Sequence, residues 1–191
     1  MLTPILTTLA FVRHPDGERV LMCHRVARSH DEQLGKYNGL GGKVERDEDV
    51  VACIRRELRE EAGIEATALR LRGTVSWPGF GRDGSDHFGF IFVVDEFSVV
   101  DGFNGEVPAA NEEGVLTWER IDDLDRLPMW AGDRHFIPLV FDDSVPQFHG
   151  VLPYRDGEPT SWTVSLLGWA PNDRGTATQQ AEPGRGANLT G

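Results

Sequence analysis

The spacing of apolar side chains along this chain alternates between two periods, which predict where strands and helices lie. Residues 5–12 form a nearly continuous aliphatic run that is typical of a buried strand, and residues 19–26 alternate apolar and polar side chains. The Pro15-Asp16-Gly17 turn between them predicts a β-hairpin. Further strands are expected over residues 69–77, 87–94 and 115–119, followed by a last hairpin of 147–154 and 161–167.

A helical period replaces the strand period after residue 47. One apolar stripe predicts an amphipathic helix of about four turns, and it comprises Val50, Val51, Ile54, Leu58 and Ala62. We expect Asp47 as the N-cap of this helix and Gly63 as its C-cap, because the side chain of Asp can accept backbone N–H groups and Gly tolerates a left-handed conformation.

The later part of the chain carries weaker helical signals. Residues 121–127 predict a short helix, and residues 129–141 predict a turn leading into a helix, in which Pro138 would lie near the start or kink the element. From residue 170 onward almost nothing can be buried, so we predict a disordered tail over 170–191. Strands on both sides of the central helix, with another helix late in the chain, favour one α/β domain over residues 1–169 with a mixed sheet between helices.

Length and charge restrict the classes of function. The chain has 191 residues, enough for one domain with a full core. Its formal net charge of −12 argues against a nucleic-acid binder, although it leaves a nucleotide substrate open because bound cations can invert the local field. The mildly apolar start is too short to span a bilayer, so no membrane association is expected. Cys23 and Cys53 are interpreted as packed, reduced thiols, which fits a reducing cytoplasm.

The central helix carries an unusual group of acids. Glu57, Glu60 and Glu61 are spaced at i, i+3 and i+4, which places three carboxylates together near the helix C-terminus, where the dipole also disfavours negative charge. A solvated face neutralised by nearby arginines is one interpretation. The other is a divalent cation, Mg²⁺ with Mn²⁺ as an alternative, which takes hard oxygen ligands. Three glycines within residues 39–42 come directly before this helix and would let the backbone approach a phosphate.

The order of residues over 42–64 resembles the Nudix box, G-x5-E-x7-R-E-U-x-E-E-x-G-U, where U is a bulky aliphatic residue. All nine fixed positions are filled, by Gly42, Glu48, Arg56, Glu57, Leu58, Glu60, Glu61, Gly63 and Ile64. This resemblance implies the Nudix α/β/α sandwich and hydrolysis of a nucleoside diphosphate compound. It implies metal ligands and catalytic groups at the Gly41 carbonyl, Glu57, Glu60, Glu61 and Glu113, with Arg56 orienting the glutamates and Glu48 as its partner. The general base would be Glu61 or Glu113, and both remain open.

The flanking segments are similar to the MutT-type 8-oxo-purine nucleoside triphosphate diphosphatases. YNGLGGKVE resembles W-N-G-[FL]-G-G-K-V, MWAGDRHFIPL resembles M-W-x-D-D-x-x-W-x-P-L, and FHGVLPY resembles F-H-G-x-F-x-F. The similarity implies that Asn38 and Asp133 hydrogen-bond the base edge and that Trp130 stacks on it. It also implies that Thr8 lies on the pocket floor, Arg25 near the phosphates and Trp77 in the pocket wall, with core packing as the alternative for both tryptophans.

Two departures from this pattern bear on the substrate. The two neighbouring acids after the tryptophan become Ala131-Gly132-Asp133, so only the second is present, and Glu32 or Gln33 stands where the loop before the box would carry a Phe. The leading prediction is Mg²⁺-dependent cleavage of oxidised purine nucleoside triphosphates, such as 8-oxo-dGTP, to the monophosphate and pyrophosphate. The alternatives are hydrolysis of another derivative, such as ADP-ribose or a dinucleoside polyphosphate, and a Nudix module that binds a nucleotide without cleaving it.

Overall fold

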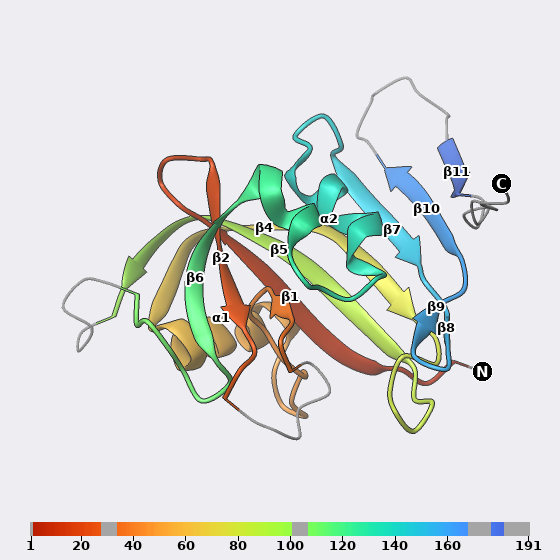
Figure 1. Cartoon of the computed structure of the whole chain (residues 1–191), viewed down its shortest axis with the longest axis horizontal. Coiled ribbons are helices and arrows are strands. Elements are labelled where there is room, and N and C mark those ends of the chain that lie inside the picture. Colours follow the sequence, from red (N-terminus) through yellow and green to blue (C-terminus); the bar gives the residue numbers. More distant parts are fainter. Residues whose placement is uncertain (1, 28–33, 101–106, 168–176, 182–191) are drawn as a thin grey trace, which may run out of the picture.

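The computed structural model describes residues 2–27, 34–100, 107–167 and 177–181. A mixed sheet of nine strands runs through the molecule in the order β11-β10-β7-β4-β5-β1-β2-β3, with β6 paired to β2 (Figure 1). The sheet strands are β1 (Ile5–Arg13), β2 (Arg19–His24), β3 (Tyr37–Asn38), β4 (Ile64–Trp77), β5 (His87–Val99), β6 (Val115–Arg120), β7 (Gln147–Val151), β10 (Trp162–Leu167) and β11 (Ala177–Ala181). The helices are α1 (Val50–Ala62), the 3-10 helix η1 (Ile121–Arg126) and α2 (Asp133–Phe141).

The pairing confirms the predicted mixed sheet. β1 runs antiparallel to β2, as the predicted hairpin requires, and parallel to β5. β4 runs antiparallel to β5 and parallel to β7, and both β4 and β5 extend beyond their predicted bounds. Of the part of the chain that the structure describes, no helix is long and apolar enough to cross a bilayer.

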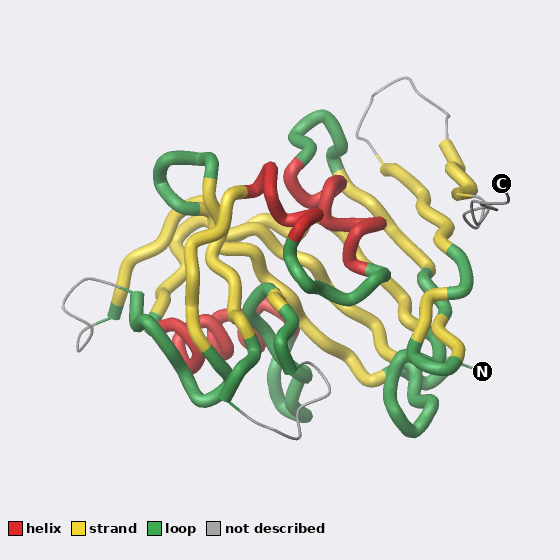
Figure 2. Tube along the Cα trace, viewed as in Figure 1, coloured by secondary structure: helices red, strands yellow, loops and turns green. Residues whose placement is uncertain are grey.

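Two hydrophobic clusters lie on opposite faces of this sheet. Successive residues of β1 point to alternate faces, so Phe11 packs into one cluster and Ala10 into the other. Phe136 of α2 belongs to the first cluster, and Ile54 and Leu58 of α1 belong to the second. The helices therefore cover different faces, as the α/β/α prediction requires, and Figure 2 shows α1 apart from η1 and α2.

Helix α1 begins two residues later than the sequence predicts. Asp49, and not Asp47, is the N-cap, because its carboxylate accepts the backbone N–H groups of Val51 and Ala52. Gly63 ends the helix in the left-handed conformation, with φ 61° and ψ 30°, as expected. The predicted apolar stripe is wrong at Val51, which is exposed, while Cys53 is buried in its place.

Pro138 lies in the interior of α2, which starts at Asp133, so the prediction that it lies near the start is wrong. The end of α2 is held to the sheet by Arg72, a buried side chain of β4. Its Nε donates to the Val140 carbonyl at 2.8 Å, and its Nη2 donates to the Leu139 and Asp142 carbonyls at 3.1 and 2.7 Å. This guanidinium supplies donors that the last turn of a helix otherwise lacks.

The chain ends in a hairpin of β7 and β10, as predicted. A small ribbon of β8 (Tyr154–Arg155) and β9 (Glu158–Pro159) lies at its tip, turning through Asp156 and Gly157. Within the predicted disordered tail, Ala177–Ala181 form strand β11 against β10, so that prediction is wrong for this segment. Residues 168–176 and 182–191 lie outside the described part of the chain.

Candidate active site

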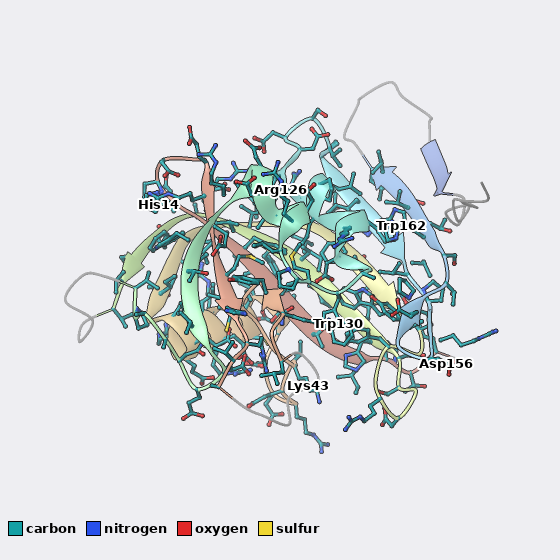
Figure 3. All side chains as sticks on the ribbon, viewed as in Figure 1. His14, Lys43, Arg126, Trp130, Asp156 and Trp162 are labelled. Carbon is teal, nitrogen blue, oxygen red and sulfur yellow. The ribbon has the colours of Figure 1, made fainter. Side chains whose placement is uncertain are left out.

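One cavity, of about 470 Å³, opens where β1, the glycine loop and the segment before α2 meet. The predicted substrate-binding residues all line it: Thr8, Arg25, Asn38, Trp77, Trp130 and Asp133. Gly41 and Glu113, two of the predicted metal ligands, line the same cavity. Figure 3 labels Trp130 and Lys43, two residues of the cavity wall. Glu57, Glu60 and Glu61 are not among its lining residues, so the cavity brings the predicted substrate-binding residues together with two of the five predicted metal ligands.

The C-terminal half of α1 faces the glycine loop. The Glu61 carboxylate accepts a hydrogen bond from the Gly41 N–H at 2.9 Å. Burial and the charge of nearby Glu113 raise the pKa of Glu61 to about 8. Burial also raises the pKa of Glu57, whose Oε1 lies 2.2 Å from where a Cβ on Gly42 would be. The carboxylates of Glu57 and Glu61 are therefore poorly hydrated and lie in contact with the backbone of the glycine loop.

Arg56 forms ion pairs with three glutamates of α1 and the loop before it. Its guanidinium contacts Glu48 at 2.8 Å, Glu57 at 2.9 Å and Glu60 at 3.1 Å. The hydrogen bond from Arg56 lowers the pKa of Glu48 to about 2. Glu60 is the most exposed of the three, with 59% of its side chain accessible. Arg56 therefore fixes the orientation of acids that would otherwise repel one another.

The loop that carries Glu113 is tied to the end of α1 by Asn111. The Asn111 Oδ1 accepts the N–H groups of Glu113 and Gly114 at 2.8 and 3.0 Å, and its Nδ2 donates to the Glu61 carbonyl at 3.1 Å. The Glu113 carboxylate pairs with Arg25. Sequence reasoning missed Asn111, although an Asn two residues before an acid is a signature of such a turn.

These residues fit a hard divalent cation. The donors are all oxygens, and burial together with neighbouring carboxylates raises the pKa values of Glu57 and Glu61. Over the described residues, no three acidic, histidine or cysteine side chains point at a common ligand position. Arg56 pairs with Glu57 and Glu60, and Arg25 pairs with Glu113.

The cavity wall also carries polar groups among aromatic rings. Asp133 opens α2, and burial raises the pKa of its carboxyl to about 7, against opposing effects of the Trp130 backbone and Lys36. Asn38 is held on β3 by pairing with Cys23 of β2. Thr8 is buried on β1, with its Oγ1 3.4 Å from the Sγ of Cys53. Cys23 and Cys53 are buried free thiols, as predicted.

Phe80 and Tyr154 line the cavity and Lys36 lies beside its wall, and none of the three was expected from the sequence. Lys36 places its Nζ 4.6 Å from the centroid of the Trp130 ring, a cation–π contact. Phe80, from the loop between β4 and β5, packs edge-on against Trp130 and Tyr154 at 5.3 and 4.9 Å. No local pattern marks these three side chains, because each reaches the site through tertiary packing. Glu32 and Gln33 lie outside the described residues.

The chain is similar to known nucleotide hydrolases over most of its length. The family profile described as NUDIX domain matches residues 3–140. An oxidized purine nucleoside triphosphate hydrolase of Danio rerio is 33% identical over 140 residues, 73% of this chain and 81% of that protein. A CTP pyrophosphohydrolase of Escherichia coli (strain K12) is 43% identical over 136 residues, 71% of this chain and 89% of that protein. The crystal structure of a MutT protein from Bacillus halodurans shares the fold with a TM-score of 0.68 and 28% identity, covering 84% of this chain and 97% of that one.

Proposed function

This chain belongs to the Nudix hydrolase family, and from that premise we propose that it hydrolyses purine nucleoside triphosphates, oxidised ones such as 8-oxo-dGTP among them, to the monophosphate and pyrophosphate. The observation that carries the proposal is one cavity whose wall includes Asn38, Trp130 and Asp133 together with Gly41 and Glu113. A base and a polyphosphate chain need both sets of residues at once.

The base end suits a purine edge. Trp130 offers a stacking surface, and the amide of Asn38 both donates and accepts hydrogen bonds. A carboxyl with a pKa of about 7, as at Asp133, can donate as the acid or accept as the carboxylate near neutral pH. The similarity to an oxidized purine nucleoside triphosphate hydrolase supports the same assignment.

The phosphate end suits cleavage of an anhydride. Mg²⁺ would be held by Glu57, Glu60, Glu61, Glu113 and the Gly41 carbonyl. When bound, it would neutralise negative charge on the phosphate oxygens. Glu61, with a pKa of about 8, or Glu113 would accept the proton of the attacking water. We place the reaction in the cytoplasm, which agrees with the two free thiols. The expected partner is a small nucleotide, with no nucleic acid and no membrane.

A substrate panel with Mg²⁺ tests this proposal. We expect pyrophosphate release from 8-oxo-dGTP, 8-oxo-GTP and dGTP to exceed release of product from CTP, ADP-ribose and diadenosine polyphosphates. Preference for CTP, ADP-ribose or the dinucleotides would keep the phosphate end and discard the base assignment. Nucleotide binding without any turnover would instead favour a binding module.

Two matched variants separate the roles of the acids. Glu61→Gln and Glu113→Gln keep the shape of each side chain and remove its charge. The variant that lacks the general base should lose turnover at every Mg²⁺ concentration. The variant that lacks only a ligand should regain activity as Mg²⁺ rises. Full activity of Glu61→Gln at low Mg²⁺ would contradict our assignment of Glu61.

A further inference from the structure

Gly132 is a glycine that its backbone does not require. It has φ −71° and ψ −26°, an ordinary helical conformation open to any residue. Space is what excludes a side chain here. A Cβ on Gly132 would lie 2.2 Å from the Tyr154 Oη and 2.5 Å from the Leu152 Cδ2. The Leu152 methyl can move aside, but the rigid ring of Tyr154 places its hydroxyl in the volume that a side chain at 132 would fill.

The ring of Tyr154 is firmly held in that position. Its side chain is buried, its N–H donates to the Pro78 carbonyl at 2.8 Å, and its ring packs edge-on against Phe80. The hydroxyl lies directly against the backbone of Gly132. Within the described part of the chain, no acceptor takes the hydrogen of this hydroxyl. Tyr154 lines the same cavity as Asp133, the next residue after Gly132.

Two departures from the MutT-type pattern therefore meet at one point in space. The first acid after the tryptophan is replaced by Gly132, and the last aromatic of the FHGVLPY segment, Phe in the pattern, is Tyr154. Compared with the pattern, position 132 lacks an acidic side chain, and position 154 carries a hydroxyl that occupies the volume a side chain at 132 would fill. The two changes are complementary, since either one alone would leave a hole or a clash.

We propose that Tyr154 is a specificity-determining residue, whose hydroxyl donates a hydrogen bond to a carbonyl oxygen on the edge of the base, beside Asp133. A phenol carries one O–H donor. That donor matches the C6 oxygen of a 6-oxo-purine. This inference rests on the proposed function, because it assumes that the base end of the cavity holds a base.

The first test is Tyr154→Phe, which keeps the ring and removes only the hydroxyl. The substrates are dGTP and 6-thio-dGTP, in which a weakly accepting sulfur replaces the C6 oxygen and the N1–H remains. We expect Tyr154→Phe to lower kcat/KM for dGTP on the order of tenfold and to change that for 6-thio-dGTP by less than about twofold. The preference for oxygen over sulfur should then disappear.

Other outcomes overturn the assignment in recognisable ways. An equal loss with both substrates would show a packing role for Tyr154, and no loss with either would show that the hydroxyl does not touch the base. Tyr37→Phe is the matched control, because Tyr37 also lines the cavity but its ring stacks on His24. Failure of the wild-type protein to hydrolyse both dGTP and 8-oxo-dGTP would overturn the proposed function itself, and this is measured before any variant.

A second test needs no substrate. Gly132→Ala should destabilise the wild-type protein, because the new Cβ meets Oη, and it should destabilise Tyr154→Phe much less. Urea unfolding of the two single variants and the double variant measures this difference. Equal destabilisation in both backgrounds would show that Oη does not fill the space at 132.

Discussion

Replacing the buried Arg72 by Met should destabilise the fold much more than replacing its exposed neighbour Arg70. Arg72 is 3% exposed and lies at a bulge of β4, where the pairing with β5 shifts between Leu71 and Gly73. Its guanidinium makes three hydrogen bonds of 2.7–3.1 Å to carbonyls at the end of α2. Met has a similar length but no donor, so the change isolates these bonds.

The magnitude follows from the carbonyls left behind. The Asp142 carbonyl also accepts the Val145 N–H at 3.0 Å, so the Leu139 and Val140 carbonyls are the two that would lose their donor. A buried carbonyl without a donor costs roughly 1–3 kcal/mol, so two would cost roughly 2–6 kcal/mol. Met avoids the desolvation of a buried guanidinium, which offsets part of this loss, and we expect a net loss of about 3 kcal/mol in the free energy of unfolding. For a chain of this size that corresponds to a fall in Tm of about 6–12 °C.

Urea and thermal unfolding of Arg72→Met and Arg70→Met provide the assay. Arg70 pairs with Asp95 at the surface, where 42% of its side chain is accessible, so its loss should cost about 1 kcal/mol or less. Both variants remove one positive charge from the same strand. If Arg72→Met cost no more than Arg70→Met, our argument that Arg72 anchors the end of α2 would be refuted.

Three further predictions concern the cavity. The folded-state pKa of Asp133, about 7, lies above its usual value of 3.8, so the native state keeps a proton that the unfolded state loses. The free energy of unfolding should therefore fall as pH rises from about 4 to about 7. Asp133→Asn should remove this fall, as measured by urea titrations between pH 4 and 8. Gly42→Ala would push a Cβ against Glu57 Oε1, so it should weaken Mg²⁺ binding in calorimetry on the order of tenfold or more. Gly84→Ala strains a backbone with φ 77° but its Cβ meets no neighbouring atom, so it should lower stability without weakening Mg²⁺ binding. Lys36→Met removes a positive charge that lowers the pKa of Asp133, so the pH midpoint of kcat/KM should move upward, and an unchanged midpoint would show that Asp133 does not control it.

The strongest sequence predictions were those in which local pattern and tertiary structure agree. The apolar stripe of α1, its Gly63 end and the β1–β2 hairpin follow from spacing and turn chemistry alone. The start of α1 shows the limit of this reasoning. Asp47 and Asp49 are equally good caps by composition, and the loop before the helix, where Arg56 holds Glu48, determines which one lies at the helix end.

Long-range packing accounts for what the sequence did not reveal. Arg72 lies in an alternating segment that predicts an exposed side chain, and only the bulge turns it inward beneath α2. Tyr154 and Phe80 line the cavity because the loop after β4 and the tip of the last hairpin meet, and sequence spacing does not encode that meeting. The roles of the site residues stay predictions that the proposed experiments address.

The separation of the two hydrophobic clusters bears on how the substrate specificity of this enzyme can change during evolution. Helix α1, which carries Glu57 and Glu61, packs in one cluster, while Tyr154 and Phe136 belong to the other, on the opposite face of the sheet. Substitutions around the proposed base-binding residues should therefore leave the packing of α1 unchanged. Directed evolution toward a new nucleobase should accumulate changes in residues 129–154 while α1 stays constant, so one inherited reaction can serve lineages with different substrates.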